Sequence, residues 1–191
     1  YLGYYTSSAA TTPNTPTKFP AASTTYYAVW GQGAYVAKSA DGKTLTFSYG
    51  AQPAGTENED WWEIAASYTS TPGWSSTTVT KVVIDQSFSG YKPTSTAYWF
   101  YGLQNMTTIE NLSNLDTSAD TNMIYMFRGC VGLSSLILPA SFDASEVTDM
   151  EGMFQGCSNL ASLTLPEAFQ TSASTNIAYM FYSCSKLATL T

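Results

Sequence analysis

The chain has 191 residues, of which 44% are hydrophobic, and this is enough apolar material for one sizeable core. Fourteen acidic and seven basic residues give a net charge of −7, which argues against nucleic acid and anionic membranes as partners, because both bind clustered basic residues. The absence of histidine removes the commonest general base and the commonest metal ligand.

Residues 1–24 are rich in Ser, Thr and Pro, a composition typical of an extended linker or tether. No signal peptide is visible at this end of the chain. No run of about 18 apolar residues occurs anywhere, so we expect no membrane insertion. Charged residues make up only 11% of the chain, about half of the usual ~25%, and this favours a secreted or surface-displayed bacterial protein.

Residues 25–78 form a second region, which we expect to be a small β-rich cap. Two apolar runs, residues 35–37 and 44–47, flank Asp41 and Gly42, and an Asp-Gly pair between such runs predicts a β-hairpin. Three bulky side chains add apolar area to this region: Trp61, Trp62 and Trp74. A cap is needed because a stack of strands exposes the edge of its first strand.

From residue 79 onward the sequence repeats with a period of 27 residues. Cysteine recurs at positions 130, 157 and 184, and phenylalanine at 100, 127, 154 and 181. Further columns keep the same step, among them Leu133, Leu160 and Leu187; Leu136, Leu163 and Leu190; Ser118, Ser145 and Ser172. Such periodicity indicates stacked structural units that share one continuous core.

Each unit contains one segment with strand character and one with helical spacing. The pattern of Leu133, Leu136 and Leu138 alternates at its end, which predicts a short strand. Met150, Met153, Phe154 and Cys157 follow i, i+3, i+4, i+7 spacing, which predicts one face of a short helix. The N-caps expected for three such helices are Thr121, Thr148 and Thr175.

We therefore predict an α/β fold, a right-handed leucine-rich-repeat solenoid of period 27 with five parallel strands and a small N-terminal β-rich cap. The predicted regions are 1–24, the linker; 25–78, the cap; and 79–191, the solenoid, whose last unit is incomplete.

Two segments carry a family resemblance. Residues 116–130 (DTSADTNMIYMFRGC) and 143–157 (DASEVTDMEGMFQGC) share the pattern D-x-S-x-x-T-x-M-x-x-M-F-x-G-C. This pattern resembles the repeat of BspA-like bacterial surface leucine-rich-repeat proteins. The segments 81–88, 93–100 and 41–47 are similar to the regions that precede those repeats. The resemblance implies a surface-exposed or secreted protein that binds host or neighbouring-cell macromolecules, with no catalytic motif to transfer.

The three cysteines invite a metal or redox interpretation, but their spacing of 27 contains no C-x-x-C pair. A disulfide between neighbouring turns is sterically open, since stacked turns lie about 5 Å apart. We favour buried free thiols, because the cysteines share the inward face with Met and Phe. No cofactor and no metal are expected.

Three other patterns suggest chemistry less strongly. Gly31 and Gly33 lack the third glycine of a dinucleotide fingerprint, so a turn is expected there. An acidic cluster, which matches no known calcium loop, consists of Glu57, Glu59, Asp60 and Glu63. Asp143 with Asp149 or Glu151 imitates a catalytic carboxylate pair, although repeated polar residues usually serve turns and caps. We expect no catalytic residue.

The outward face of the strands is the candidate ligand-binding surface, because repeat proteins usually bind partners on their concave sheets. Its residues alternate with the inward columns and are Lys81, Val83, Thr108, Glu110, Ser135, Ile137, Ser162, Thr164 and Thr189. An alternative surface is aromatic and draws on Tyr91, Tyr98, Tyr101, Tyr125, Tyr179 and Tyr182.

We expect a non-enzymatic binding or adhesion module, extracellular or on the bacterial cell surface, whose partner is a protein or glycan on host or neighbouring cells. A structural spacer within a larger surface protein is one alternative. A carbohydrate-binding module is another, and it requires two or three exposed aromatic residues on one face. We also expect residues beyond 191, or edge-to-edge self-association at the open last unit.

Overall fold

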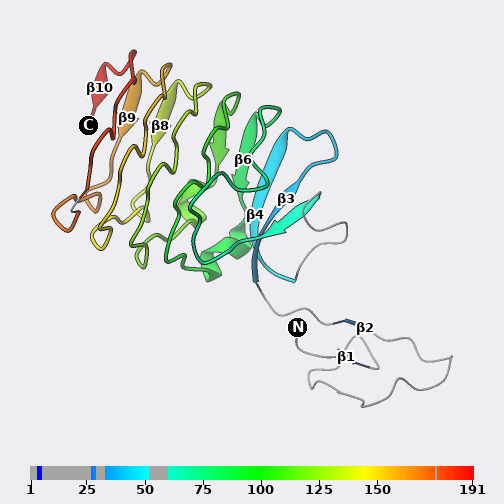
Figure 1. Ribbon diagram of the computed structural model, residues 1–191. Coiled ribbons are helices and arrows are strands. Elements are labelled where there is room, and N and C mark those ends of the chain that lie inside the picture. Colours follow the sequence, from blue (N-terminus) through cyan, green and yellow to red (C-terminus); the bar gives the residue numbers. More distant parts are fainter. Residues whose placement is uncertain (1–3, 6–26, 29–32, 52–59, 175) are drawn as a thin grey trace.

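A computed structural model describes residues 4–5, 27–28, 33–51, 60–174 and 176–191 (Figure 1). The described residues form ten short strands and two short 3₁₀ helices. In chain order the elements are β1 Tyr4–Tyr5, β2 Tyr27–Ala28, β3 Gly33–Lys38, β4 Thr44–Gly50, β5 Trp61–Glu63, β6 Lys81–Ile84, η1 Gln86–Gly90, β7 Thr108–Glu110, η2 Leu112–Asn114, β8 Ser135–Ile137, β9 Ser162–Thr164 and β10 Thr189–Leu190.

The larger strands fall into two separate sheets. The first has five strands in the order β5-β3-β4-β6-β7, and the second has three in the order β10-β9-β8. The pairs β4–β6, β6–β7, β8–β9 and β9–β10 are parallel, whereas β3 pairs antiparallel with β4 and β5. A further antiparallel pair joins β1 to β2. The predicted linker of residues 1–24 lies almost wholly outside the described residues.

The predicted hairpin is confirmed by β3 and β4. Their antiparallel register pairs Val36 with Phe47, and Gly42 takes a φ of 69° in the connecting loop. The Asp41 carboxylate accepts hydrogen bonds from the Ser39 hydroxyl and the Lys43 amide, which closes the loop. Strand β4 then pairs in parallel with β6, so the hairpin covers the edge of the first repeated strand. The boundary drawn at residue 78 stays a prediction.

The structure corrects the predicted fold class. The described residues contain no α-helix, and their only helical elements are η1 and η2, of five and three residues. The chain is mostly sheet and turn, with two small sheets rather than one parallel sheet backed by helices. The prediction of an α/β leucine-rich-repeat solenoid was therefore wrong.

The predicted helices fail for a backbone reason. Tyr125, Gly129, Gly152 and Gly156 have positive φ angles of 54°, 74°, 54° and 75°, and two left-handed residues four positions apart interrupt an α-helix in each segment. Each of these segments is instead a run of tight turns, in which Met153 bonds to the carbonyl of Met150. The i, i+3, i+4 spacing thus arises from successive turns.

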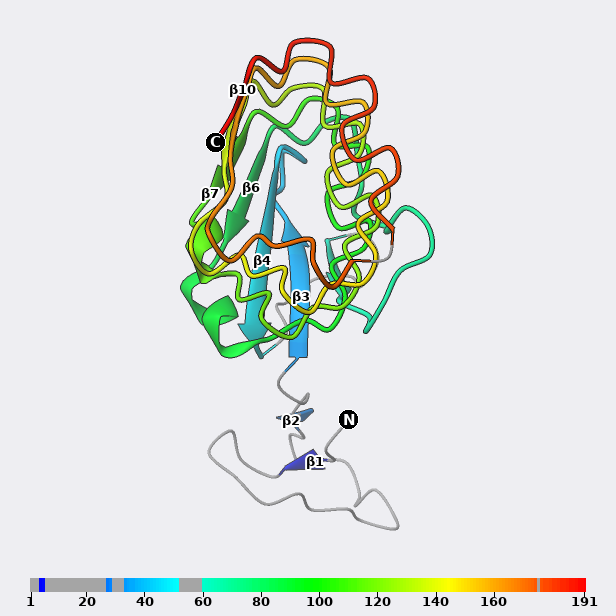
Figure 2. The ribbon, with the colours of Figure 1, turned by 90° about the vertical axis from the view of Figure 1, so that its left-hand side faces the viewer.

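Successive 27-residue units lie one above the next, held by backbone hydrogen bonds between turns (Figures 1 and 2). The Met123 amide donates to the Asp149 carbonyl, and Tyr125 donates to Glu151, with the same pattern one unit further on. Thr121 and Thr148, predicted as helix N-caps, donate their hydroxyls to the carbonyls of Thr94 and Thr121. Thr175 lies outside the described residues.

One apolar core runs through the stack from Ala34 in β3 to Met180. Most residues of the predicted inward columns are buried, including Val82, Leu136 and Leu163, whereas Leu190 in the last unit is 50% exposed. Phenylalanine rings stack along the axis, with centroid separations of 5.4 Å for Phe127–Phe154 and 5.6 Å for Phe154–Phe181. The periodic columns of the sequence are therefore packed columns in space.

The five repeated strands occur where they were predicted, but β7 and β8 do not pair. Asn111, which follows β7, takes a φ of 57° where the other units have Leu138 and Leu165. On the facing turn, a Cβ atom at Gly132 would lie 2.6 Å from the Met106 carbonyl oxygen. The backbones of the two units are thus in close contact at Met106 and Gly132, just before β7 and β8, although the two strands themselves form no ladder.

Candidate functional site

All nine predicted ligand-binding residues lie on strands β6 to β10, and none belongs to the apolar core. Within each sheet they stand side by side: Lys81 opposite Thr108, Val83 opposite Glu110, and Ile137 opposite Thr164. We call this surface the strand face. It consists of Lys81, Val83, Thr108, Glu110, Ser135, Ile137, Ser162, Thr164 and Thr189.

The strand face is weakly charged and has one prominent apolar side chain. Ile137 in β8 is 71% exposed, which is high for a residue of its size. At one end, the Lys81 ammonium lies 3.4 Å from a Glu110 carboxylate oxygen, and both side chains remain partly exposed. At the other end, the hydroxyls of Thr164 and Thr191 lie 3.2 Å apart. The charges at the Lys81 end are therefore paired, and Ile137 is the residue most open to a partner.

A second surface lies on the turns that face away from the strands (Figure 2). Tyr98, Tyr101, Tyr125 and Arg128 form what we call the Tyr–Arg cluster. The ring of Tyr98 lies 5.5 Å from that of Tyr101 and 5.4 Å from that of Tyr125. The Arg128 guanidinium lies 5.4 Å from the Tyr101 ring centre and 4.7 Å from the Tyr125 ring centre, which is cation–π geometry.

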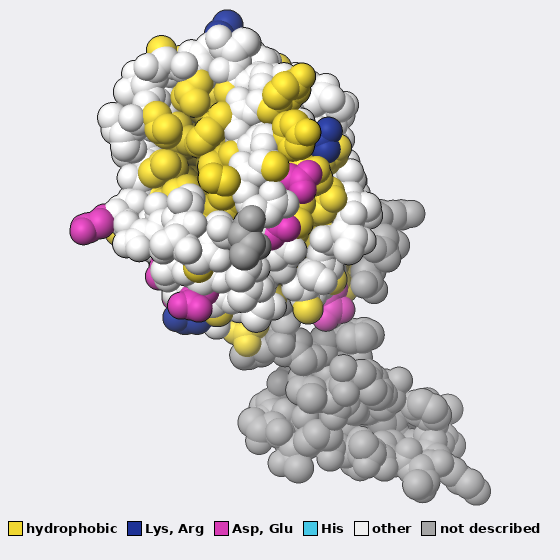
Figure 3. All heavy atoms as spheres, turned by 60° about the vertical axis from the view of Figure 1, so that its left-hand side comes forward, with side chains coloured by type: hydrophobic (Ala, Val, Ile, Leu, Met, Phe, Trp, Pro, Cys, Tyr) yellow, Lys and Arg dark blue, Asp and Glu magenta, His cyan; other side chains and the backbone are white. Residues whose placement is uncertain are grey.

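Glu151 borders the Tyr–Arg cluster. It accepts hydrogen bonds from the Tyr125 hydroxyl and from the Asn176 side-chain amide. The bond to Glu151 raises the pKa of Tyr125 to about 12, and the same bond lowers the pKa of Glu151. Figure 3 shows a face on which hydrophobic side chains lie next to basic and acidic ones. The Tyr–Arg cluster and the adjoining Glu151 therefore place aromatic, cationic and anionic groups side by side.

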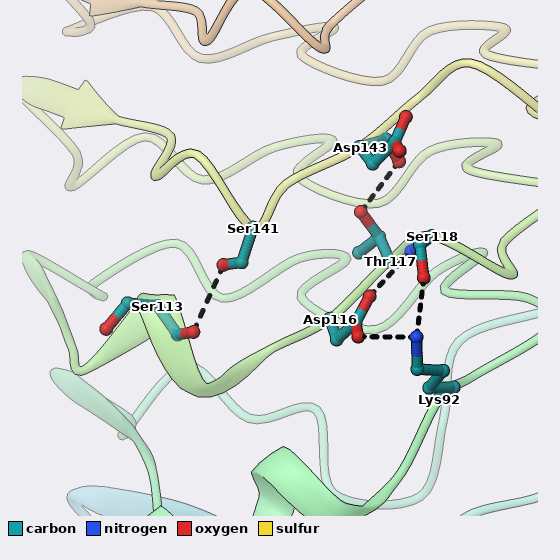
Figure 4. Close-up of polar contacts among 7 residues, drawn as sticks. All are labelled: Lys92, Ser113, Asp116, Thr117, Ser118, Ser141 and Asp143. Atoms are coloured by element: carbon teal, nitrogen blue, oxygen red, sulfur yellow. Dashed lines mark hydrogen bonds and ion pairs between the residues drawn. The ribbon is translucent and has the colours of Figure 1, made fainter.

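A polar hollow of about 360 Å³ is lined by residues of η1 and η2 and of the segments that follow η2 and β8. Its lining includes Ser118, Ser141 and Asp143, and Lys92 reaches its rim (Figure 4). The Lys92 ammonium lies 2.8 Å from Asp116 and donates to the Ser118 hydroxyl, and the Lys92 bond is the main reason why the pKa of Asp116 falls to about 2. A carboxyl with so low a pKa stays ionised and cannot act as a general acid near neutral pH.

The repeated acids serve the backbone. Asp116 and Asp143 accept hydrogen bonds from the amides of Ser118 and Ser145, two residues on. Asp149, in the adjacent column, accepts one from the Glu151 amide. The expectation that these acids stabilise turns is confirmed, and Asp143 carries no interaction that suggests a catalytic pair.

The cysteines are free thiols, as predicted. Cys130 and Cys157 are fully buried, and each donates its thiol hydrogen to a carbonyl of the preceding unit, at Phe100 and Phe127. Burial raises the pKa of the Cys130 thiol well above its usual range and that of Cys157 to about 12. Within the described residues, no group of acids and cysteines is placed to hold a metal ion.

Two earlier candidates lie at the margins of the described residues. Gly31 falls outside them, as do Glu57 and Glu59 of the acidic cluster. The three tryptophans of the predicted cap are all buried, at 8%, 7% and 1% exposure for Trp61, Trp62 and Trp74. They pack in the N-terminal sheet region and offer no aromatic platform to a sugar.

Comparison with known proteins adds one finding. Residues 94–190 match the family described as "Mycoplasma protein of unknown function, DUF285", which is just over half of the chain. The chain belongs to this family. The DUF285 match spans β7 to β10, the Tyr–Arg cluster and most of the strand face. Neither the curated proteins nor the solved structures include a match to the chain.

This match corrects the predicted resemblance. Both segments that suggested BspA-like leucine-rich-repeat proteins, residues 116–130 and 143–157, lie within the DUF285 match. The pattern of Asp, Met, Phe and Cys in those segments therefore belongs to DUF285, and the BspA-like interpretation was wrong. The partners attributed to BspA-like proteins carry no weight for this chain.

Sequence reasoning found the strand face but only part of the Tyr–Arg cluster. The tyrosines stood out, whereas Arg128 looked like one of seven scattered basic residues. Its signal was positional, because Arg128 falls one period after Tyr101 and three residues after Tyr125.

No described helix is both long and apolar enough to cross a bilayer.

Proposed function

We propose that this DUF285 protein is a non-enzymatic binding module that works outside the bacterial cell or on its surface, and that its strand face docks a protein partner. The observation that carries the proposal is the exposure of Ile137, 71%, beside the small hydroxyl side chains of Ser135, Ser162 and Thr164 on β8 and β9. An exposed aliphatic side chain among small hydroxyl residues provides an anchor that a shallow apolar pocket on a partner can bury.

A protein partner suits this face better than a glycan. Sugars are usually held by exposed aromatic rings, and the strand face has none among its nine residues, while the tryptophans are buried. The Lys81–Glu110 pair lies at the rim, where charges set the orientation of a partner more than its affinity. Location outside the cell is supported by the low share of charged residues, 11%.

The rival proposal is a structural spacer that binds nothing and holds other parts of a surface protein apart. The two proposals differ in one observable, which is the presence of a ligand. Arrays of extracellular-matrix proteins, plasma proteins and glycans probed with the purified chain would separate them.

A substitution borrowed from the repeat tests the role of the strand face. Thr164 occupies the position of Ile137 one unit later, so Ile137→Thr fits the same backbone. We expect it to weaken binding to an array-identified protein by roughly tenfold, as loss of an interface anchor does. Val131→Thr, a similar change in a turn, should leave the dissociation constant unchanged. Silent arrays, or equal affinity in Ile137→Thr, would count against the proposal.

A further inference from the structure

We propose that the Tyr–Arg cluster is a second binding site, which captures a carboxylate group on a protein partner. It lies on the turn side of the stack, away from the strand face, and is independent of the function proposed for that face. Its members are Tyr98, Tyr101, Tyr125 and Arg128.

The first argument is that the Arg128 guanidinium is held in place by aromatic rings while its N–H groups have no hydrogen-bond acceptor within the described residues. Its guanidinium rests against the rings of Tyr101 and Tyr125, at 5.4 and 4.7 Å from their centres. Among the described residues the guanidinium has no salt-bridge partner and donates no hydrogen bond, although its charge adds to the hydrogen bonds from Tyr125 and Asn176 that lower the pKa of Glu151. A guanidinium held against aromatic rings keeps its N–H groups available at its edge, in a fork that matches a planar carboxylate.

The second argument is the backbone at two of the tyrosines. Tyr98 and Tyr125 have φ angles of 65° and 54°, a left-handed conformation that favours glycine. Gly152 occupies the same position one unit later and has a φ of 54°. Tyr179 occupies this position in the last unit and has a φ of 58°, so three of the four units place tyrosine where glycine fits without strain. Strained residues of this kind cluster at sites where the side chain has a task.

The third argument is that Tyr125 is held in place. A Cβ atom at position 152 would lie 2.5 Å from the Tyr125 ring, so the missing side chain of Gly152 makes room for that ring. The Tyr125 hydroxyl is bound by Glu151, which is itself bound by Asn176. A rigid aromatic side chain loses little conformational freedom when a partner binds, which is why tyrosine and arginine dominate protein interfaces.

Charge selects the class of ligand. The chain carries a net charge of −7, and Glu151 stands beside the cluster, so a densely anionic polymer would be repelled. A single carboxylate next to apolar groups meets less of this repulsion than a polyanion, because it carries one charge that Arg128 can pair while its neighbours pack on the tyrosine rings. An Asp or Glu residue in a weakly charged peptide segment has this chemistry.

The test is a selection of random peptides displayed on phage against the purified 191-residue chain. We expect the selected peptides to share an Asp or Glu next to an aromatic or aliphatic residue. Affinities of a synthetic selected peptide would then be measured for the wild-type chain, Arg128→Lys and Arg128→Gln. Both variants should bind the peptide more weakly than the wild type, by a factor of roughly ten or more. Glutamine loses the charge, and lysine keeps the charge but loses the two parallel N–H groups that pair with a carboxylate. Lys92→Gln removes a cation at the polar hollow and should bind like the wild type.

A further variant separates binding from folding. Tyr98→Gly introduces the glycine that the repeat itself uses at position 152, so its melting temperature should be unchanged or higher while peptide affinity falls. Selected peptides without an acidic residue, or unchanged affinity in Arg128→Gln, would overturn the proposal. Stronger competition by an oligosaccharide of uronic acids than by the peptide would overturn the assignment of a protein partner. If the selected peptide still bound Arg128→Gln but no longer bound Ile137→Thr, the peptide site would be the strand face and the proposal for the Tyr–Arg cluster would be wrong.

Discussion

Thr96 and Asp120 form a buried polar pair at positions that the next unit fills with apolar side chains. The Thr96 hydroxyl donates to an Asp120 carboxylate oxygen at 2.6 Å, and the Asn122 amide donates to the other oxygen. Both residues are 0% exposed. One period later the same positions hold Met123 and Val147, which are also buried. Burial raises the pKa of Asp120 from 3.8 to about 6, in spite of these hydrogen bonds.

This raised pKa makes stability depend on pH in a defined window. Folded Asp120 holds its proton more tightly than unfolded Asp120, so its contribution is fully present below about pH 4 and is lost as the pH rises through about 6. A shift of this size corresponds to roughly 2–3 kcal/mol. Urea unfolding from pH 4 to 8 should show this loss in the wild type and not in Asp120→Asn. If the free energy of unfolding changed with pH in the same way in the two proteins, the pKa of Asp120 would not be raised by folding.

The repeat also supplies a replacement for the pair. The double variant Thr96→Met and Asp120→Val copies the following unit, and we expect it to be more stable than the wild type at pH 8, because it removes an ionised buried carboxylate. The gain should shrink at pH 4, where Asp120 is protonated. Calorimetric melting at the two pH values checks both statements.

The turn segment that replaces each predicted helix is defined by left-handed residues and by contact with the turn above. Gly102 and Gly152 illustrate the difference between these two constraints. Gly102 has a φ of 72°, and a Cβ atom there would meet nothing within 4 Å. Gly152 has a φ of 54°, but its Cβ would meet the Tyr125 ring.

Alanine at these two glycines should separate backbone strain from contact. Gly102→Ala should cost about 1–2 kcal/mol from the left-handed backbone alone. Gly152→Ala should cost roughly 1–3 kcal/mol more, because the Tyr125 ring must move. In a Tyr125→Gly background the extra cost should vanish. Chemical denaturation of the wild type, the three single variants and the double variant measures the extra cost, and an equal loss of stability at both glycines would exclude the contact with Tyr125.

The elements were only partly predictable from the sequence. The columns of Leu, Phe and Cys identified the buried face and the strand positions, because a fixed period requires equivalent environments. The spacing of Met150, Met153, Phe154 and Cys157 does not distinguish a helix from successive turns, and the left-handed angles that decide the matter occur at Tyr125 as well as at glycines. No periodicity reveals the interrupted ladder between β7 and β8 or the left-handed backbone of Asn111, which follows β7.

The candidate surfaces were predictable to different degrees. Alternation along a strand places Ile137 outward, so the strand face followed directly from the pattern. The Tyr–Arg cluster depends on where ring planes lie, and only the structure shows Arg128 stacked on Tyr101 and Tyr125. Gly152, 27 positions after Tyr125, leaves room for the Tyr125 ring because it has no side chain. The sequence alone does not show this relation.

At the scale of the whole molecule, a single apolar cluster links the hairpin, the repeated strands and the turns. Cys130 and Cys157 lie deep in this cluster and are bonded to carbonyls of the preceding unit, whereas Cys184 is only partly buried. The accessibility of the thiols therefore reports on how far the stack has opened.

Thiol labelling should follow this order. With a maleimide reagent at neutral pH, we expect Cys184 to react first, and Cys130 and Cys157 to react together and only as the protein unfolds, because their thiolates are disfavoured and shielded. Mass spectrometry of digested samples along a urea series gives the order. Rapid labelling of Cys130 in native buffer would contradict the packing described for the cysteine column.

One column of polar residues limits how such a chain can change in length. Ser95, Asn122, Asp149 and Asn176 each accept a hydrogen bond from the amide two residues on. The backbone of Asp149 also forms parallel bridges to Asn122 one unit before it and to Asn176 one unit after it. An insertion of a few residues within a turn would displace every later column from its partner in the turn before. Gain or loss of a complete 27-residue unit keeps all columns aligned. Length variation by whole units is therefore the change that this architecture tolerates, and a duplicated unit should add one turn without disturbing its neighbours.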